Sequence, residues 1–216
     1  MALADIGAFC VRWRALIELP MNEGEFAPVS LISRLFASRS SGRPHSRDAL
    51  RPLWDSVVAI GREREWYASL GIADTVSGRF DAITLVLSLV MLRMERGVQT
   101  EHVAGGAKAP LVDASARLTE LFVEDMDGQL RQSGVGDLVV GKRMGKLVSV
   151  LGGRIGALRE ALDDGADEAT LPCALERNTT LVDGADPVAL AIAVRHLHTR
   201  FQALGDDAIL SGEIGQ

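Results

Sequence analysis

The chain contains an apolar run, AITLVLSLVML at residues 82–92, in which only Thr84 and Ser88 are polar. A helix that is apolar all round is buried on all sides. The run is too short to cross a bilayer, because a spanning helix needs about 20 apolar residues. The sequence therefore predicts one central core helix, over residues 79–96, that several other elements must cover.

Most of the remaining chain has apolar residues at three- and four-residue spacing, which predicts amphipathic helices. Aromatic residues make up only 5% of the chain, and no alternating strand pattern competes. We predict an all-α fold, a single compact helical domain of about six to seven helices, with a loop at 97–109. The other expected helices cover residues 48–69, 111–132, 137–162, 168–178 and 186–204.

Residues 1–47 have a different character. Two short amphipathic segments are followed by ASRSSGRPHSRD, which is rich in Ser, Arg, Gly and Pro and has nothing to bury. This pattern predicts a mobile N-terminal arm, and we place the helical domain at residues 48–212.

The bulk properties exclude several classes of protein. A net charge of −6 argues against a chain that coats nucleic acid. The two cysteines, Cys10 and Cys173, lie far apart without metal or redox spacing, which indicates a reducing compartment. No unbroken apolar run reaches membrane-spanning length. The expected location is the cytoplasm, with peripheral association at the inner membrane left open.

Positive charge is concentrated in one segment. Residues 131–159 contain six basic side chains against one acidic, whereas residues 160–216 contain eleven acidic side chains against three arginines. A basic face formed by Lys142, Arg143, Lys146 and Arg154 suits an anionic partner, such as RNA phosphate, lipid head groups or an acidic protein. Simple solvation of these charges is the alternative.

A stripe of small residues runs along the predicted 137–162 helix. Gly141, Gly145, Gly152 and Gly156 share a face with Ser149, although each interior glycine costs about 1 kcal/mol relative to alanine. Close approach of another helix is the usual compensation. Either an internal neighbour, such as the 79–96 helix, or a helix of another polypeptide meets this requirement.

An acidic cluster gives the only candidate for catalysis. Asp125 and Asp127 lie in FVEDMDGQ, yet no second matching cluster exists to hold metal ions as in isoprenoid synthases. A small-molecule-binding or metal-dependent all-α enzyme would need these aspartates to face Lys142 or Arg143 in a polar cavity. A solvated acidic stripe is the simpler interpretation, so no catalytic residue, metal or cofactor is predicted.

Several segments together resemble the ubiquinol–cytochrome c chaperone family. They are WYASLGIADTVSGRFDAITLVLSLVMLRM, LFVEDMDGQLRQSGVGDLVVGKRMGKLVSVLGGR and LERN at residues 175–178. The matching motif residues are Trp66-Tyr67, Gly71, Asp74, Thr75, Gly78, Arg79, Phe80, Asp81, Asp125-Met126-Asp127, Gly134-Val135-Gly136-Asp137 and Gly141-Lys142-Arg143. The chain departs from the pattern at Val86, where the family usually has a histidine, and at Leu151-Gly152, where an aromatic residue is usual.

The resemblance implies a non-enzymatic assembly factor for the cytochrome bc respiratory complex. It implies cytochrome b, or another membrane-protein client, as partner, with a small partner subunit and a ribosome or anionic membrane contact as further candidates. No sequence-specific nucleic-acid partner is expected. The candidate partner-binding residues are Arg79, Asp125, Asp127, Arg131, Lys142, Arg143, Lys146, Arg154, Gly141, Gly145, Gly152 and Gly156.

The segment SLISRLF resembles the usual beginning of bacterial family members. Val29 is therefore a candidate native initiator, which makes residues 1–28 a candidate non-native extension. An additional amphipathic helix that folds onto the domain is the alternative.

Overall fold

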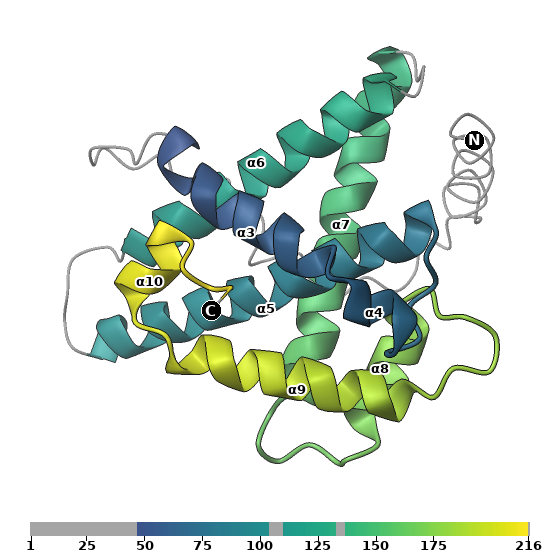
Figure 1. Ribbon diagram of the computed structural model, residues 1–216. Coiled ribbons are helices and arrows are strands. Elements are labelled where there is room, and N and C mark those ends of the chain that lie inside the picture. Colours follow the sequence, from purple (N-terminus) through teal and green to yellow (C-terminus); the bar gives the residue numbers. More distant parts are fainter. Residues whose placement is uncertain (1–46, 104–109, 133–136, 216) are drawn as a thin grey trace, which may run out of the picture.

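A computed structural model describes residues 47–103, 110–132 and 137–215, without the side chains of residues 47–48, 98–103, 110 and 137–143. The predicted N-terminal arm lies almost entirely outside the described residues and stays a prediction. The described chain is helical, so the all-α prediction is confirmed (Figure 1). Its elements are η1 (Arg47–Leu50), α3 (Arg51–Gly61), α4 (Arg64–Ala68), α5 (Val76–Val103), α6 (Pro110–Gln132), α7 (Asp137–Ala161), α8 (Thr170–Asn178), α9 (Pro187–Ala203) and α10 (Asp206–Ser211).

Helix α5 is the centre of the fold, as the apolar run predicts. Helices α3, α6, α7, α9 and α10 all pack against it, and Figure 1 shows it crossed by α7 and flanked by α3 and α9. Every side chain from Thr84 to Met94 is buried. The two hydroxyl groups of the run are satisfied within the helix, because Thr84 Oγ1 donates to Phe80 O at 2.9 Å and Ser88 Oγ donates to Thr84 O at 2.7 Å.

Helix α5 is longer than predicted, and the predicted loop at 97–109 is wrong for residues 97–103, which are helical. The error comes from treating Gly97 as a helix terminator. Gly97 instead lies where α6 comes close, since an added Cβ would be 2.3 Å from Leu111 Cδ1. The bounds of α6, α7, α8 and α9 agree with the prediction within two residues.

The helix predicted over 48–69 is divided between α3 and α4. Side chains of α4 donate to carbonyl groups at the end of α3: Trp66 Nε1 to Ile60 O at 2.7 Å, and Tyr67 Oη to Gly61 O at 2.6 Å. Both carbonyls lie at the end of α3, where the usual partner four residues later is missing. The aromatic pair therefore stabilises a sharp turn where the apolar spacing alone suggested a continuous helix.

Two loops that are distant in sequence are joined beside α5. Ala73 N donates to Thr180 O and Val182 N donates to Gly71 O, both at 2.9 Å, and Ile72 forms an isolated bridge with Leu181. Gly71 has a φ of +78°, a conformation that favours glycine. The start of α5 is therefore attached to the α8–α9 connection.

We expect Gly61→Ala to destabilise the fold by about 1–3 kcal/mol, because the new methyl group overpacks the α3–α5 contact. An added Cβ would lie 2.8 Å from the Ile83 Cα, which is backbone and cannot rotate away. Urea denaturation measures the change.

The matched control is Gly128→Ala in α6, where nothing lies within 4 Å of an added Cβ. This variant should be neutral or gain up to about 1 kcal/mol from helix propensity. Equal behaviour of the two variants would contradict the close α3–α5 packing.

Candidate functional site

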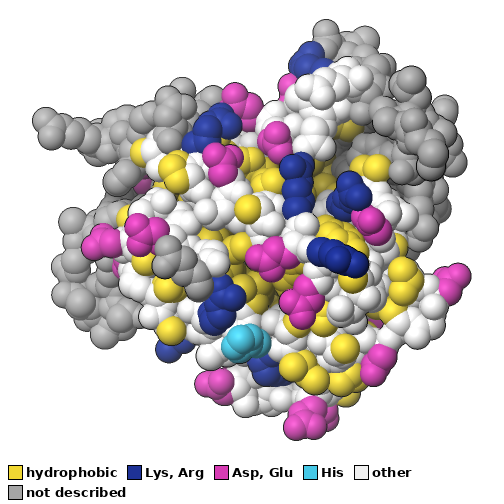
Figure 2. All heavy atoms as spheres, viewed as in Figure 1, with side chains coloured by type: hydrophobic (Ala, Val, Ile, Leu, Met, Phe, Trp, Pro, Cys, Tyr) yellow, Lys and Arg dark blue, Asp and Glu magenta, His cyan; other side chains and the backbone are white. Residues whose placement is uncertain are grey.

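A groove with a volume of about 780 Å³ opens between α4, the start of α5, the end of α6 and the middle of α7. Its apolar floor comes from three helices. Its rim carries charged side chains, and Figure 2 shows basic side chains gathered around a hydrophobic hollow. We call it the arginine-rimmed groove; its floor is Phe80, Met126, Leu130 and Leu147, and its charged rim is Arg62, Arg64, Arg79 and Asp74.

The rim charges differ in their pairing. Arg79 Nε donates to Asp74 Oδ1 at 2.7 Å, and this hydrogen bond lowers the pKa of the Asp74 carboxyl. Both side chains are about 60% exposed, so the pair adds little stability. Arg62 and Arg64 are exposed and form no ion pair with any carboxylate in the described part of the chain. Tyr67 lines the same groove, and burial raises the pKa of its phenol.

The glycine stripe of α7 faces away from the core at Gly145 and Gly156. At about 100° per residue, Gly145 lies roughly opposite Leu147, which is buried. No atom of a described residue lies within 4 Å of a Cβ added at Gly145, Gly153 or Gly156. The alternative of an internal helix packed against the stripe is therefore wrong at Gly145 and Gly156. We call the surface of Gly145, Ser149, Gly153 and Gly156 the open glycine face.

Arg154 does not lie on an exposed basic face, and that part of the prediction is wrong. Its side chain is 5% exposed, because α5 and α8 both pack against α7. The helical count explains this placement: Arg154 lies seven residues after Leu147, about 20° away around the helix and so within the buried seam. Its guanidinium belongs to a core network.

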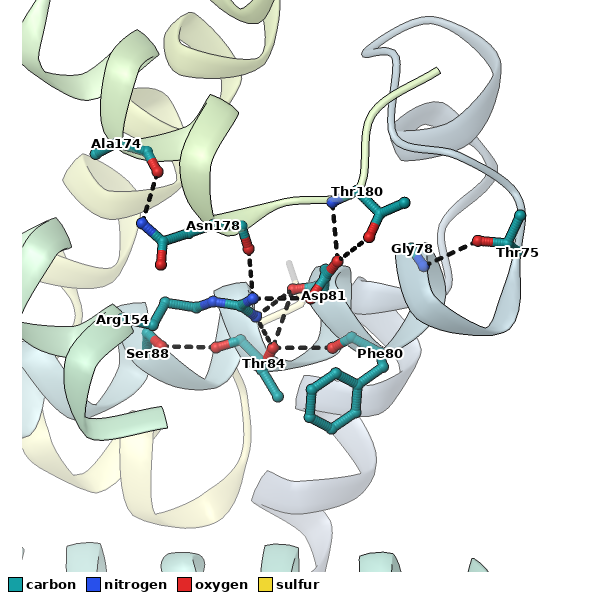
Figure 3. A network of polar contacts seen from close by, with 10 residues as sticks. All are labelled: Thr75, Gly78, Phe80, Asp81, Thr84, Ser88, Arg154, Ala174, Asn178 and Thr180. Atoms are coloured by element: carbon teal, nitrogen blue, oxygen red, sulfur yellow. Dashed lines mark hydrogen bonds and ion pairs between the residues drawn. The ribbon is translucent and has the colours of Figure 1, made fainter. Parts of the chain in front are cut away.

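The Arg154 network joins three segments (Figure 3). Arg154 Nη2 donates to Asp81 Oδ1 at 2.8 Å, and the guanidinium also donates to Thr84 Oγ1 and to the Asn178 carbonyl. The second carboxylate oxygen of Asp81 accepts from Thr180 N at 2.8 Å and from Thr180 Oγ1 at 2.7 Å. A buried charge pair needs such additional hydrogen bonds to offset desolvation. The network therefore connects α5, α7 and the end of α8.

The acidic candidates do not form a shared site. Asp125 Oδ2 accepts from Gln129 at 3.2 Å, and Asp127 Oδ2 accepts from Arg131 at 2.7 Å, so each bonds a residue one turn further along α6. Among the described residues, no group of three or more His, Cys, Asp and Glu side chains could hold a metal ion.

The remaining predicted residues are only partly placed. Gly152 and Lys146 are half-buried on α7. The structure does not describe the side chains of Lys142 and Arg143 or the surroundings of Gly141. Within residues 47–103, 110–132 and 137–215, no helix is long and apolar enough to span a membrane.

Comparison with known proteins shows what kind of chain this is. The family model described as ubiquinol-cytochrome C chaperone matches residues 68–215. The chain belongs to this chaperone family. It is also similar to the crystal structure of the Cbp3 homolog from Brucella abortus, with a TM-score of 0.64 and 29% identity over 84% of this chain and 94% of that one. No curated protein matches the chain.

Several residues of the motifs that resemble the family have a structural role here. Thr75 Oγ1 accepts from Gly78 N at 3.2 Å at the start of α5, and a Cβ at Gly78 would lie only 1.9 Å from Ala73 O. Asp81 and Asn178 bind the Arg154 guanidinium. These residues hold the start of α5 against α7 and α8, and so position the groove beside them.

Sequence reasoning identified Arg79 but missed Arg62 and Arg64 as its neighbours on the groove. These two arginines flank the α3–α4 turn, where the predicted continuous helix would have spread them around its surface. The aromatic pair Trp66-Tyr67, which begins two residues after Arg64, could have indicated the turn, because its side chains bond the end of α3.

We expect Arg154→Ala to destabilise the fold by about 3–5 kcal/mol, because it leaves the Asp81 carboxylate buried without its partner. The Asp81 side chain is only 13% exposed. Chemical denaturation measures the loss.

Arg159→Ala is the control. Arg159 lies on the same helix as Arg154 and forms an exposed ion pair with Glu95 of α5 at 2.7 Å. That variant should lose no more than about 1 kcal/mol. An Arg154 variant as stable as the Arg159 variant would show that the network contributes little.

Proposed function

We propose that the chain acts without catalysis as an assembly chaperone that binds newly made or newly inserted cytochrome b. In doing so it promotes assembly of the ubiquinol–cytochrome c reductase complex. The observation that carries the proposal is the match to the chaperone family over residues 68–215. The similarity to the Brucella Cbp3 homolog over most of both chains supports the same role.

The open glycine face is the proposed contact for a client helix. Helices of membrane proteins associate closely where small residues let the backbones approach. Gly145, Gly153 and Gly156 offer such a surface, because an added Cβ would meet nothing there. The cost of these glycines in a helix, about 1 kcal/mol each, is not offset by packing against the part of the chain that the structure describes. A partner helix provides the missing reason for the glycines.

A basic contact at the start of α7 is the second part of the proposal. Lys142, Arg143 and Lys146 follow one another within two turns, near Arg131 at the end of α6 in the sequence. Such a cluster suits ribosomal RNA or an anionic membrane surface without sequence recognition. A chaperone that receives a membrane protein during synthesis works at the cytoplasmic face of the inner membrane, where both partners are available.

The competing function is a metal-dependent or small-molecule-binding enzyme that uses Asp125 and Asp127. No observation favours it, since each aspartate bonds a neighbour on its own helix. The family to which the chain belongs is also described as a chaperone family.

We expect the double substitution Gly145→Leu and Gly156→Leu to remove most recovery of cytochrome b. The new side chains hold a client helix away from the α7 backbone. Mild crosslinking, purification of the tagged protein from its own cells and mass spectrometry measure the recovery. The free energy of unfolding should not fall, because both positions face open space.

Gly128→Leu on α6 controls for the added bulk, since its Cβ position is equally open. Full recovery of cytochrome b by the α7 double variant would exclude the open glycine face as the client site. Absence of cytochrome b with the unaltered protein would reject the proposed function itself.

Joint replacement of Lys142, Arg143 and Lys146 by glutamate should abolish co-sedimentation with ribosomes or with anionic liposomes, because it reverses the charge that attracts phosphate groups. Unchanged sedimentation with both would remove the basic cluster as a docking surface.

A further inference from the structure

The arginine-rimmed groove shares no residue with the open glycine face, and it combines an apolar floor with a positively charged rim. Its floor is apolar, with Met126, Leu130 and Leu147 each more than 90% buried beneath it. Its rim has three arginines against Asp74, a local charge of +2 on a protein of net charge −6. We propose that the groove binds an amphipathic helix of a partner protein, one whose apolar stripe is flanked by carboxylates.

The positive charge of the rim favours a partner with negatively charged side chains. Arg62 and Arg64 are exposed and have no carboxylate partner in the part of the chain that the structure describes. Arg62, Arg64, Tyr67 and Arg79 all line the same groove. Guanidinium groups form strong bidentate contacts with carboxylates. A ligand with acidic side chains beside its apolar face therefore meets both requirements of the groove.

The shape of the groove favours a helix over a small molecule. A pocket for a small ligand encloses most of the surface of that ligand. This hollow is instead open to solvent along one side (Figure 2). Its floor is assembled from α5, α6 and α7, with Met126 and Leu130 one turn apart on α6. Apolar side chains at three- and four-residue spacing on a partner helix dock into grooves of this kind.

The preceding segment of the same chain has the wrong charge for this site. Residues 29–46 contain Arg34, Arg39 and Arg43 and no acidic residue. Its amphipathic part would bring positive charge to a positive rim, which like-charge repulsion disfavours. Residues 29–46 are therefore a poor match for the groove, and the acidic helix that we propose as its occupant belongs to another protein. The inference goes beyond the proposed function, because it concerns a different surface and a different class of partner.

The test uses the purified full-length chain and a fluorescent synthetic peptide of 18 residues, about five helical turns, with leucines on one face and glutamates on both flanks. Fluorescence anisotropy measures the affinity. Binding should weaken with added salt and should fall at least about tenfold in the double variant Arg62→Glu and Arg64→Glu, because both rim charges are reversed. A second peptide, with lysines in place of the glutamates, should not bind.

The matched control is the double variant Arg177→Glu and Arg195→Glu, two exposed arginines of α8 and α9 that do not line the groove. It changes the net charge by the same amount and should bind the acidic peptide like the unaltered chain. All substituted side chains are exposed, so circular dichroism should show an unchanged fold.

Three outcomes overturn the inference. Equal binding of the lysine peptide, or equal loss in both double variants, would show that the groove does not select the partner. Sedimentation with phosphatidylglycerol vesicles that depends on Arg62 and Arg64, without peptide binding, would assign the groove to a membrane surface. The assay contains no cytochrome b, so its result is independent of the client experiment.

Discussion

The burial of residues 84–94 of α5 on all sides is the constraint on which the rest of the structure depends. A helix without a polar face can exist in water only if other helices cover it completely. Helices α3, α6, α7, α9 and α10 provide that cover. The buried hydroxyl groups of α5 donate to its own carbonyls, and its buried Arg93 donates to Leu204 O and to Asp206 of α10. The positions of the surrounding helices follow from this single requirement.

The Arg154 network fixes one end of this assembly. Burial of a guanidinium and a carboxylate is expensive, and the cost is offset only when further hydrogen bonds satisfy both groups. Asp81 receives them from Thr180, and Arg154 makes them to Thr84 and Asn178. The hydrophobic effect has no direction, whereas these bonds do, so they set the orientation of α7 against α5 and α8. Because the buried seam of α7 faces this network, Gly145, Gly153 and Gly156 are left on the outer side.

The two candidate contact surfaces differ in their physics. The open glycine face offers exposed backbone with little charge, which suits a helix that comes from a membrane. The arginine-rimmed groove offers an apolar floor with a positive rim, which suits an acidic amphipathic helix in water. Both surfaces adjoin α7, so the proposed client and the proposed second partner would contact the same helix.

The sequence by itself determined the helical class, the central place of α5 and the bounds of α6 to α9 within two residues, because hydrophobic periodicity is a local property of the chain. The sequence did not predict the α3–α4 turn, the extension of α5 past Gly97 or the burial of Arg154. The turn depends on bonds from Trp66 and Tyr67, and Gly97 on the approach of Leu111. Arg154 depends on partners 73 residues before it and 24 after it. Only the tertiary structure decided these features and the joining of Arg62 and Arg64 with Arg79 around one groove, because each requires contacts between segments that are distant in sequence.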